Sequence, residues 1–342
     1  MNFIQHLNVY TLNVKTFNYL TNYSYTYTTM ETLVNGLHHV TALAGDAQAN
    51  VDFYTHILGL RLVKKTINFD APDVYHLYYG DETGSPGSIL TFFPYGKGIP
   101  RGRKGGGQLT YTAFSIPTAS INFWTSRLQE FNISFSGPYQ RFSETYLRFD
   151  DFDGMGVELV AHDNDNRPGW SNGFIPVEHA IKGFHTVTLN EVQVDDTVKL
   201  LTELLGHTLV SEEAGLFRFQ AGKGGSGNYV DVRHAVNDVR AHQGAGSVHH
   251  VAFSTDSDES QIVLQHQLLE AGYHVTPVQD RNYFHSIYFR EPGGILFEVA
   301  TNPPGFAVDE SVAELGKTLK LPEWYEPRRA KIEAALPKIE VK

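Results

Sequence analysis

The chain lacks cysteine altogether, and it has no long apolar run. With Cys 0, disulfides and thiolate zinc sites are excluded, and a cytoplasmic location suits a chain without cysteine. No apolar stretch approaches the roughly 18 residues that a transmembrane helix requires. Basic residues are also scarce, because 27 Lys and Arg face 38 Asp and Glu and leave a formal net charge of -11. We therefore expect neither nucleic acid nor an anionic membrane as a partner.

The first 33 residues differ from the rest of the chain. They are rich in Asn, Thr and Tyr, they show no apolar periodicity, and they lack the basic start and compact apolar segment of a secretory signal. We predict a poorly ordered N-terminal extension over residues 1–33. The remainder of the 342 residues, with 41% hydrophobic content overall, suffices for two domains.

From residue 36 onward, one pattern of elements occurs four times. Each unit begins with a strand, continues with a helix and ends with further strands, which gives a βαβββ repeat. The predicted opening strands cover residues 38–43, 108–114, 183–188 and 247–253. The predicted helices cover residues 46–58, 119–131, 195–205 and 258–271. Asp46, Asp195 and Asp258 are suitable N-caps for three of these helices.

A single βαβββ unit cannot cover its own sheet, so the units must pair. We predict an α+β fold in which four modules pair into two half-open β-barrel domains. The predicted boundaries along the chain are 34–162 for modules one and two, 163–180 for a linker, 181–305 for modules three and four, and 306–342 for a tail with a short helix. The linker is placed where Asn, Asp, Gly and Pro accumulate.

Histidine and glutamate occur at corresponding places in units one and four. The opening strands of these units carry His-His-Val at residues 38–40 and 249–251, and the closing strand of unit four carries Glu298 between apolar neighbours. A carboxylate on an apolar strand is costly to bury unless a positive charge neutralises it. Two histidines and one carboxylate form the facial triad that holds non-haem Fe(II) and leaves positions open for O2 and substrate. We therefore predict an iron site built from units one and four.

Alignment of the units gives each candidate ligand a counterpart. In unit order, the aligned residues are His39, Tyr111, His185 and His250 on the opening strands, and Phe92, Glu158, Asp231 and Glu298 on the closing strands. Only units one and four supply two histidines and a carboxylate, and Phe92 leaves the fourth position without a ligand. We expect the residues of units two and three to form a degenerate site or a structural polar cluster, because hydrogen bonds also satisfy buried carboxylates.

One histidine of each His-His pair is expected to bind the metal, because neighbouring side chains on a strand point to opposite faces. His185 stands alone in unit three and aligns with the second histidine of each pair, which selects His39 and His250 as ligands. His38 and His249 are then candidates for orienting the ligands or for moving protons.

Two further residues precede Glu298 and have the chemistry of a catalytic site. Tyr288 is suited to donate a hydrogen bond to a bound oxygen or to accept a substrate proton. Arg281 is suited to stabilise an oxyanion or a peroxo intermediate. The structural alternatives, a core aromatic residue and a surface charge, remain open for these two positions.

Several segments together resemble a known family. They are Leu37-His38-His39-Val40-Thr41, Gly45-Asp46-Ala47-Gln48, Tyr75-His76-Leu77-Tyr78-Tyr79, His249-His250-Val251-Ala252-Phe253 and Arg290-Glu291-Pro292-Gly293-Gly294. On these segments the chain is similar to the ring-cleaving dioxygenases of the vicinal oxygen chelate superfamily, which also contains glyoxalases and bleomycin resistance proteins, and within it to the hydroquinone-cleaving branch.

The resemblance implies a chemistry as well as a fold. It implies one Fe(2+), with Mn(2+) as the other metal to consider, and O2-dependent cleavage of a small aromatic para-diol. The family's metal ligands correspond to His39, His250 and Glu298. Its acid–base and outer residues correspond to His38, His249, Arg281 and Tyr288.

Other functions stay open on the sequence alone. They are a catechol extradiol dioxygenase, a glyoxalase-like isomerase or thiol transferase, and a metal-free module that binds an aromatic compound. The specific diol is not identified by the sequence. The C-terminal tail is expected to pack across a barrel or a neighbouring subunit, so a homo-oligomer also remains open.

Overall fold

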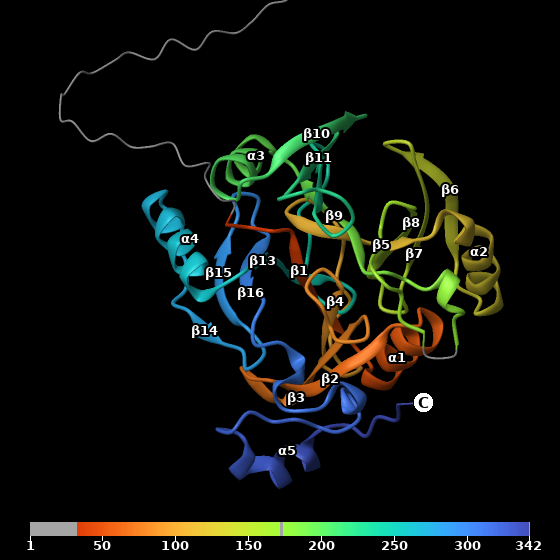
Figure 1. Ribbon diagram of the computed structural model, residues 1–342, viewed down its shortest axis with the longest axis vertical. Coiled ribbons are helices and arrows are strands. Elements are labelled where there is room, and N and C mark those ends of the chain that lie inside the picture. Colours follow the sequence, from red (N-terminus) through yellow and green to blue (C-terminus); the bar gives the residue numbers. More distant parts are fainter. Residues whose placement is uncertain (1–32, 172–173, 342) are drawn as a thin grey trace, which may run out of the picture. The chain divides into compact units, whose positions relative to one another are not determined.

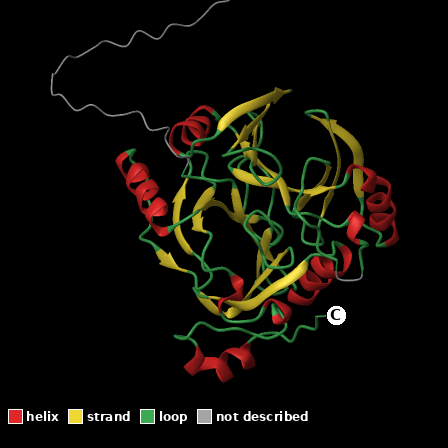
Figure 2. Cartoon of the chain, viewed as in Figure 1, coloured by secondary structure: helices red, strands yellow, loops and turns green. Residues whose placement is uncertain are grey.

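The computed structural model describes residues 33–171 and 174–341, which contain two eight-stranded sheets (Figures 1 and 2). The predicted extension over residues 1–33 therefore lies outside the described residues except for its last one. The first sheet contains β1 (Leu37–Ala44), β2 (Arg61–Asn68), β3 (Ala71–Gly80), β4 (Ile89–Pro94), β13 (Val248–Thr255), β14 (Gln279–Asp280), β15 (His285–Arg290) and β16 (Leu296–Thr301). The second sheet contains β5 (Gln108–Ile116), β6 (Phe135–Arg141), β7 (Glu144–Asp150), β8 (Gly156–Ala161), β9 (Phe184–Glu191), β10 (Thr208–Glu213), β11 (Leu216–Gln220) and β12 (Tyr229–His234).

The order of strands confirms four βαβββ modules in an α+β fold with two curled half-barrels. The first sheet runs β14-β15-β16-β13-β1-β4-β3-β2, so it joins module four to module one. The second runs β10-β11-β12-β9-β5-β8-β7-β6 and joins module three to module two. The two ranges expected from the sequence, 34–162 and 181–305, therefore do not each correspond to one sheet. Each sheet takes four strands from one range and four from the other.

The junction between β1 and β13 sets the position of the first half-barrel. These strands pair antiparallel, with Thr41 opposite His250 and His39 opposite Ala252, and register shifts occur on both sides of this stretch. β13 in turn pairs parallel with β16, with Ala252 opposite Glu298. Residues from the first and last modules are therefore neighbours on one continuous sheet.

The helices are α1 (Ala47–Val51), α2 (Ile121–Glu130), α3 (Asp195–Lys199), α4 (Asp258–Glu270) and α5 (Arg329–Ala335), and α1 and α3 continue into π-helical turns. Asp46 caps α1, because its side chain accepts hydrogen bonds from the backbone N–H groups of residues 48 and 49. The expected caps Asp195 and Asp258 lie instead in the first turns of α3 and α4. Among the described residues, no helix has the length and apolar character to cross a membrane.

The C-terminal tail packs on the first half-barrel of its own chain. The Tyr325 hydroxyl donates to the backbone oxygen of Phe69 at 2.8 Å, and the Tyr75 hydroxyl donates to that of Pro337 at 3.0 Å. The backbone N–H of Lys320 also donates to the oxygen of Lys65. The tail therefore covers β2 and β3, and α5 lies where the sequence predicts a short helix.

A buried carboxyl pair links the two half-barrels. Glu191 ends β9, and Glu291 follows β15. Glu291 accepts hydrogen bonds from Thr197 Oγ1 at 2.6 Å and from the backbone N–H groups of Gly293 and Ile295 at 2.8 Å each. Burial, followed by the charge of Glu291, raises the pKa of Glu191 to about 8, so Glu191 carries the proton at neutral pH.

Because of this pair, we expect the protein to become less stable as the pH rises. The folded protein retains a proton on Glu191 that the unfolded chain releases near pH 4.3, so the free energy of unfolding decreases as the pH rises from about 4.3 to about 8. We expect the melting temperature to fall between pH 6.5 and pH 8.5. The Glu191→Gln variant, with a neutral isostere, should show a smaller fall in scanning calorimetry. An equal fall in both proteins would contradict the assignment.

Candidate metal centre

Three buried ligands meet where β1, β13 and β16 lie side by side. His39 Nε2 lies 3.2 Å from His250 Nε2 and 3.2 Å from Glu298 Oε2, and His250 Nε2 lies 3.0 Å from the same oxygen. All three residues are buried. The structure thus brings together the three residues that the sequence predicts as metal ligands.

The chemistry of this cluster fits a divalent metal ion. Glu298 Oε1 accepts a hydrogen bond from Ser286, whereas Oε2 is buried without a hydrogen-bond partner. An orphaned carboxylate oxygen in the protein interior requires a positive partner. Two metal–ligand bonds of about 2.1 Å at a right angle separate their donor atoms by about 3.0 Å, which is close to the three observed distances. The residues therefore have both the composition and the spacing of a facial triad.

Each ligand histidine is held by the histidine that precedes it. His38 Nδ1 lies 2.9 Å from His39 Nδ1, and His249 Nδ1 lies 2.7 Å from His250 Nδ1. Because each Nδ1 atom is occupied, each Nε2 atom points toward Glu298. Burial, followed by repulsion from the adjacent ligand histidine, lowers the pKa of both His38 and His249 to about 3, so both are neutral imidazoles.

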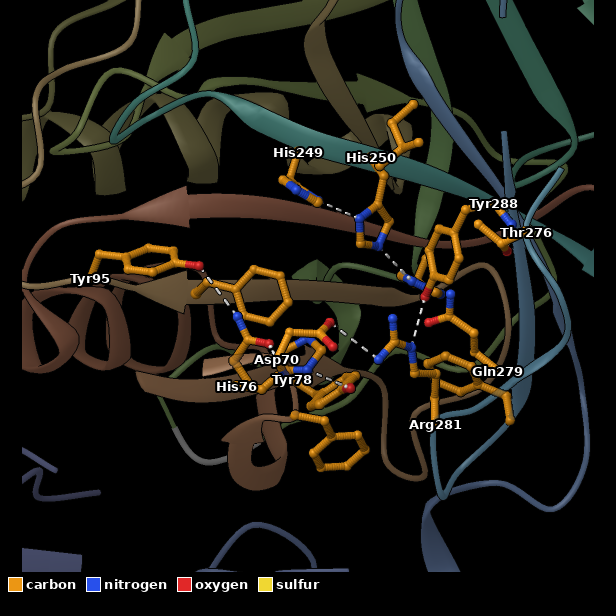
Figure 3. Close-up of a pocket in the computed structure, with 16 residues that line it drawn as sticks. Asp70, His76, Tyr78, Tyr95, His249, His250, Thr276, Gln279, Arg281 and Tyr288 are labelled. Atoms are coloured by element: carbon orange, nitrogen blue, oxygen red, sulfur yellow. Dashed lines mark hydrogen bonds and ion pairs between the residues drawn. The ribbon is translucent and has the colours of Figure 1, made fainter. Parts of the chain in front are cut away.

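A cavity of about 450 Å³ borders the two ligand histidines, and Figure 3 shows the side chains that line it. His39 and His250 line it together with His249, Arg281 and Tyr288. His38 is buried and does not line the cavity. Phe284, which does line it, lies with its ring centroid 5.0 Å from that of His38. Of the four predicted catalytic residues, three therefore line the cavity, whereas His38 lies behind the wall and contacts His39 and Phe284.

Arg281 and Tyr288 form a pair at the cavity wall. Arg281 Nε donates a hydrogen bond to the Tyr288 hydroxyl at 3.1 Å. Burial, followed by the negative charge of Glu298, raises the pKa of Tyr288 well above its usual value. Tyr288 therefore stays protonated at neutral pH. It can donate a hydrogen bond to a ligand, but it cannot act as a base.

His76 is a cavity residue that the sequence analysis did not select. Its Nε2 lies 2.8 Å from Thr91 Oγ1, its Nδ1 lies 2.8 Å from the Tyr78 hydroxyl, and Thr91 in turn contacts Thr41 at 2.8 Å. Burial, followed by the nearby ligand histidines, lowers the pKa of His76 well below its usual value. Side chains alternate along β3, so His76 and Tyr78 lie on the same face of this strand. This alternation is the signal in the sequence that could have identified the two as neighbours.

The fourth position of the site is occupied by Thr91 rather than by Phe92. β1 and β4 pair parallel with Thr41 opposite Thr91, which corresponds to Ala252 opposite Glu298 in the other module. Phe92 points to the opposite face, where its ring lies 4.5 Å from that of Tyr54 in the core. The prediction that Phe92 corresponds to Glu298 was therefore wrong by one residue. The expectation that unit one contributes no carboxylate or imidazole at this position still holds, because the residue there is a threonine.

The second half-barrel has arginine-paired carboxylates at the corresponding places. Glu158 accepts from Arg141 at 2.7 Å and from Arg148 at 2.5 Å. Asp231 accepts two hydrogen bonds from Arg218, at 2.7 and 2.9 Å. These contacts support the structural interpretation of both carboxylates.

The alignment of His185 also needs a correction. Ala113 pairs with Thr186 as Thr41 pairs with His250, so Thr186 replaces the ligand histidine. His185 therefore corresponds to the first histidine of the His-His pair rather than to the second.

Comparison with known proteins places these observations in a family. The model of the Glyoxalase/Bleomycin resistance protein/Dioxygenase superfamily matches residues 36–159 and 183–299. "Putative ring-cleaving dioxygenase MhqO" of Bacillus subtilis is 45% identical over 307 residues, which cover 90% of this chain and 97% of that protein. The chlorohydroquinone/hydroquinone 1,2-dioxygenase of Sphingobium indicum is 36% identical, over 84% of this chain and 91% of its own. A Bacillus subtilis crystal structure with a provisional dioxygenase assignment is 44% identical, with a TM-score of 0.87 over 91% of this chain and 99% of its own.

Removal of the Glu298 charge should empty the metal site. We expect Glu298→Gln to weaken Fe(II) binding by more than about 100-fold, because an amide oxygen cannot replace the anionic ligand. Glu158→Gln is the matched control, since its carboxylate occupies the same register in the other sheet and is paired with arginine. Metal analysis after anaerobic gel filtration measures both variants. An iron-replete Glu298→Gln protein would show that the ligands are misassigned.

Proposed function

The chain belongs to the Glyoxalase/Bleomycin resistance protein/Dioxygenase superfamily, within its ring-cleaving dioxygenases, and we propose that it cleaves a hydroquinone-like para-diol with O2 in an Fe(II)-dependent reaction. The observation that carries this proposal is the buried His39, His250 and Glu298 cluster, which faces a cavity large enough for a small aromatic ring. The named activity of the Sphingobium relative supports the para-diol as substrate class.

The ligand set favours an oxygenase over the other activities of this fold. With threonine at the fourth position, three protein ligands leave room for two reactants at the metal. His39, His250 and Glu298 would hold the iron, which would supply the open coordination positions and the electron transfer that reactions of O2 require. Mn(II) is compatible with the same donor atoms. A metal-free binding module is disfavoured because it would leave Glu298 Oε2 buried and unpaired.

We assign different roles in substrate binding and proton transfer to the residues of the cavity. His249 lines the cavity directly beside the ligand His250, so it is the group we assign to take the proton of the reacting hydroxyl. Tyr288 stays protonated and donates to the resulting oxyanion, while the fixed positive charge of Arg281 stabilises it. His38, which is not part of the cavity wall, positions His39 instead of handling protons.

A second pair of side chains suits the far hydroxyl of a para-diol. Asn68 and Tyr95 line the cavity, and Figure 3 shows Tyr95 on the side opposite Arg281 and Tyr288. Asn68 Oδ1 accepts from the backbone N–H of Asp70 at 3.0 Å, and Nδ2 donates to the Tyr95 hydroxyl at 3.3 Å. The Tyr95 hydroxyl thus accepts a hydrogen bond from Asn68 and still has its own O–H to donate. We assign the substrate oxygen opposite the reacting hydroxyl as the acceptor of this O–H.

Oxygen uptake tests the proposed reaction. The Fe(II)-loaded protein is expected to consume O2 with hydroquinones and to consume it more slowly with catechols. Tyr288→Phe should lower kcat by about 100-fold with a smaller change in KM, because the lost hydrogen bond forms with the developing charge. Tyr139→Phe, at an exposed position in the other half-barrel, is the control. Uptake with catechols alone would replace the para-diol by an ortho-diol, and no uptake with any diol would refute the proposal.

The Tyr95 assignment makes a separate prediction on substrate binding. Tyr95→Phe should raise KM for hydroquinone by about 3- to 10-fold, the effect of losing one neutral hydrogen bond. The KM for catechol should not change, because its second hydroxyl lies beside the first and does not reach this wall. Steady-state oxygen consumption measures both constants. Equal increases for the two diols would mean that Tyr95 shapes the cavity without recognising the far oxygen.

A further inference from the structure

A second group of metal-binding side chains occurs in the other half-barrel. Glu144 begins β7, His162 follows β8, and His185 lies in β9. Their three ligand atoms all lie within 4.8 Å of one another. We propose that Glu144, His162 and His185 bind a second divalent transition-metal ion, with zinc as the best match. The proposal does not rest on the dioxygenase reaction.

His185 has the orientation of a metal ligand. It is fully buried, and its Nδ1 lies 2.8 Å from Ser226 Oγ. Its Nε2 faces Glu144 Oε1 at 2.9 Å but has no partner in hydrogen-bond geometry. The ligands His39 and His250 have the same arrangement, with Nδ1 held by a neighbour and Nε2 directed at a carboxylate. Such an outer contact at one ring nitrogen is typical of histidines that bind metal through the other.

Glu144, like Glu298, has one oxygen fixed by a neighbouring side chain, although the donor to Glu144 is charged and the donor to Glu298 is neutral. Arg218 Nη1 donates to Glu144 Oε2 at 2.6 Å, and Asp231 fixes Arg218 from the other side. The remaining oxygen, Oε1, faces the two histidines. In Glu298 one oxygen is likewise occupied, by Ser286, and the other faces the imidazoles. Each carboxylate therefore presents one oxygen to its histidine pair and has the other fixed by a neighbouring donor.

His162 completes the set and gives the ion a route of entry. Its Nδ1 lies 3.8 Å from Glu144 Oε1, and its ring centroid lies 5.1 Å from that of His185, against 5.3 Å between His39 and His250. The side chain of His162 is 19% exposed and that of Glu144 is 12% exposed. Two histidines and one glutamate, with a fourth position for water, form a familiar zinc donor set. Solvent contact on the His162 side lets the ion reach the buried Nε2 of His185.

The competing interpretation is an ion pair between His185 and Glu144 without a metal. Measuring zinc binding by the full chain with the Glu298→Gln substitution distinguishes a metal site from a metal-free ion pair. The substitution is needed because it disables the triad of His39, His250 and Glu298. After removal of metal and equilibration with Zn(II), we expect one zinc per chain after gel filtration and a higher melting temperature with zinc than without it. The metal-free ion pair predicts neither effect.

Two variants in that background localise the zinc. His162→Asn should weaken zinc binding by at least about 10-fold, and it leaves the contacts of Arg218 and Ser226 intact. Glu144→Gln should abolish binding. His234→Asn, at an exposed position at the end of β12, is the matched control and should bind as the background does. The proposal is overturned if the background protein binds no zinc, or if the zinc it binds is unaffected by both His162→Asn and Glu144→Gln.

Discussion

The antiparallel pairing of β1 with β13 is the constraint on which the active half-barrel depends. It joins the first module to the fourth, and it brings His39 within 3.2 Å of His250 although 211 positions separate them in the chain. β16 then places Glu298 beside both through its pairing with β13. No local segment contains more than part of the site. The triad consequently exists only when the whole first sheet has formed.

The negative charge of a buried carboxylate is balanced differently in the two half-barrels. In the first, Glu298 Oε2 faces two imidazoles and lacks a hydrogen-bond donor, so a metal ion is needed to balance its charge. In the second, the corresponding Glu158 is neutralised by two arginines, and the position is closed to a cation. One scaffold thus supports a reactive centre on one sheet and a salt-bridge network at the equivalent place on the other.

The sequence predicted the four modules and the convergence of His39, His250 and Glu298, because both rest on repetition. Where it failed, the error was a slip of one residue, which moves a strand side chain to the opposite face. This explains why Phe92 was chosen in place of Thr91, and why His185 was matched to the wrong histidine. His76 was missed because its importance comes from cross-strand contacts with Thr91 and the cavity. The His-His-Val pattern indicated that modules one and four meet at the triad, but the linker predicted at 163–180 suggested domains of consecutive modules, because turn residues mark breaks in the chain and not partners in a sheet.

The position of the C-terminal tail has a consequence for substrate selection. Tyr325 anchors the backbone of Phe69, and Phe69 lies between two other residues of the cavity wall, Asn68 and Asp70. Trp324 also packs on the Phe69 ring, at 5.6 Å. The last part of the polypeptide therefore supports one wall of the cavity beside the triad. Substitution or proteolytic removal of this segment would change the shape of the cavity without changing His39, His250 or Glu298.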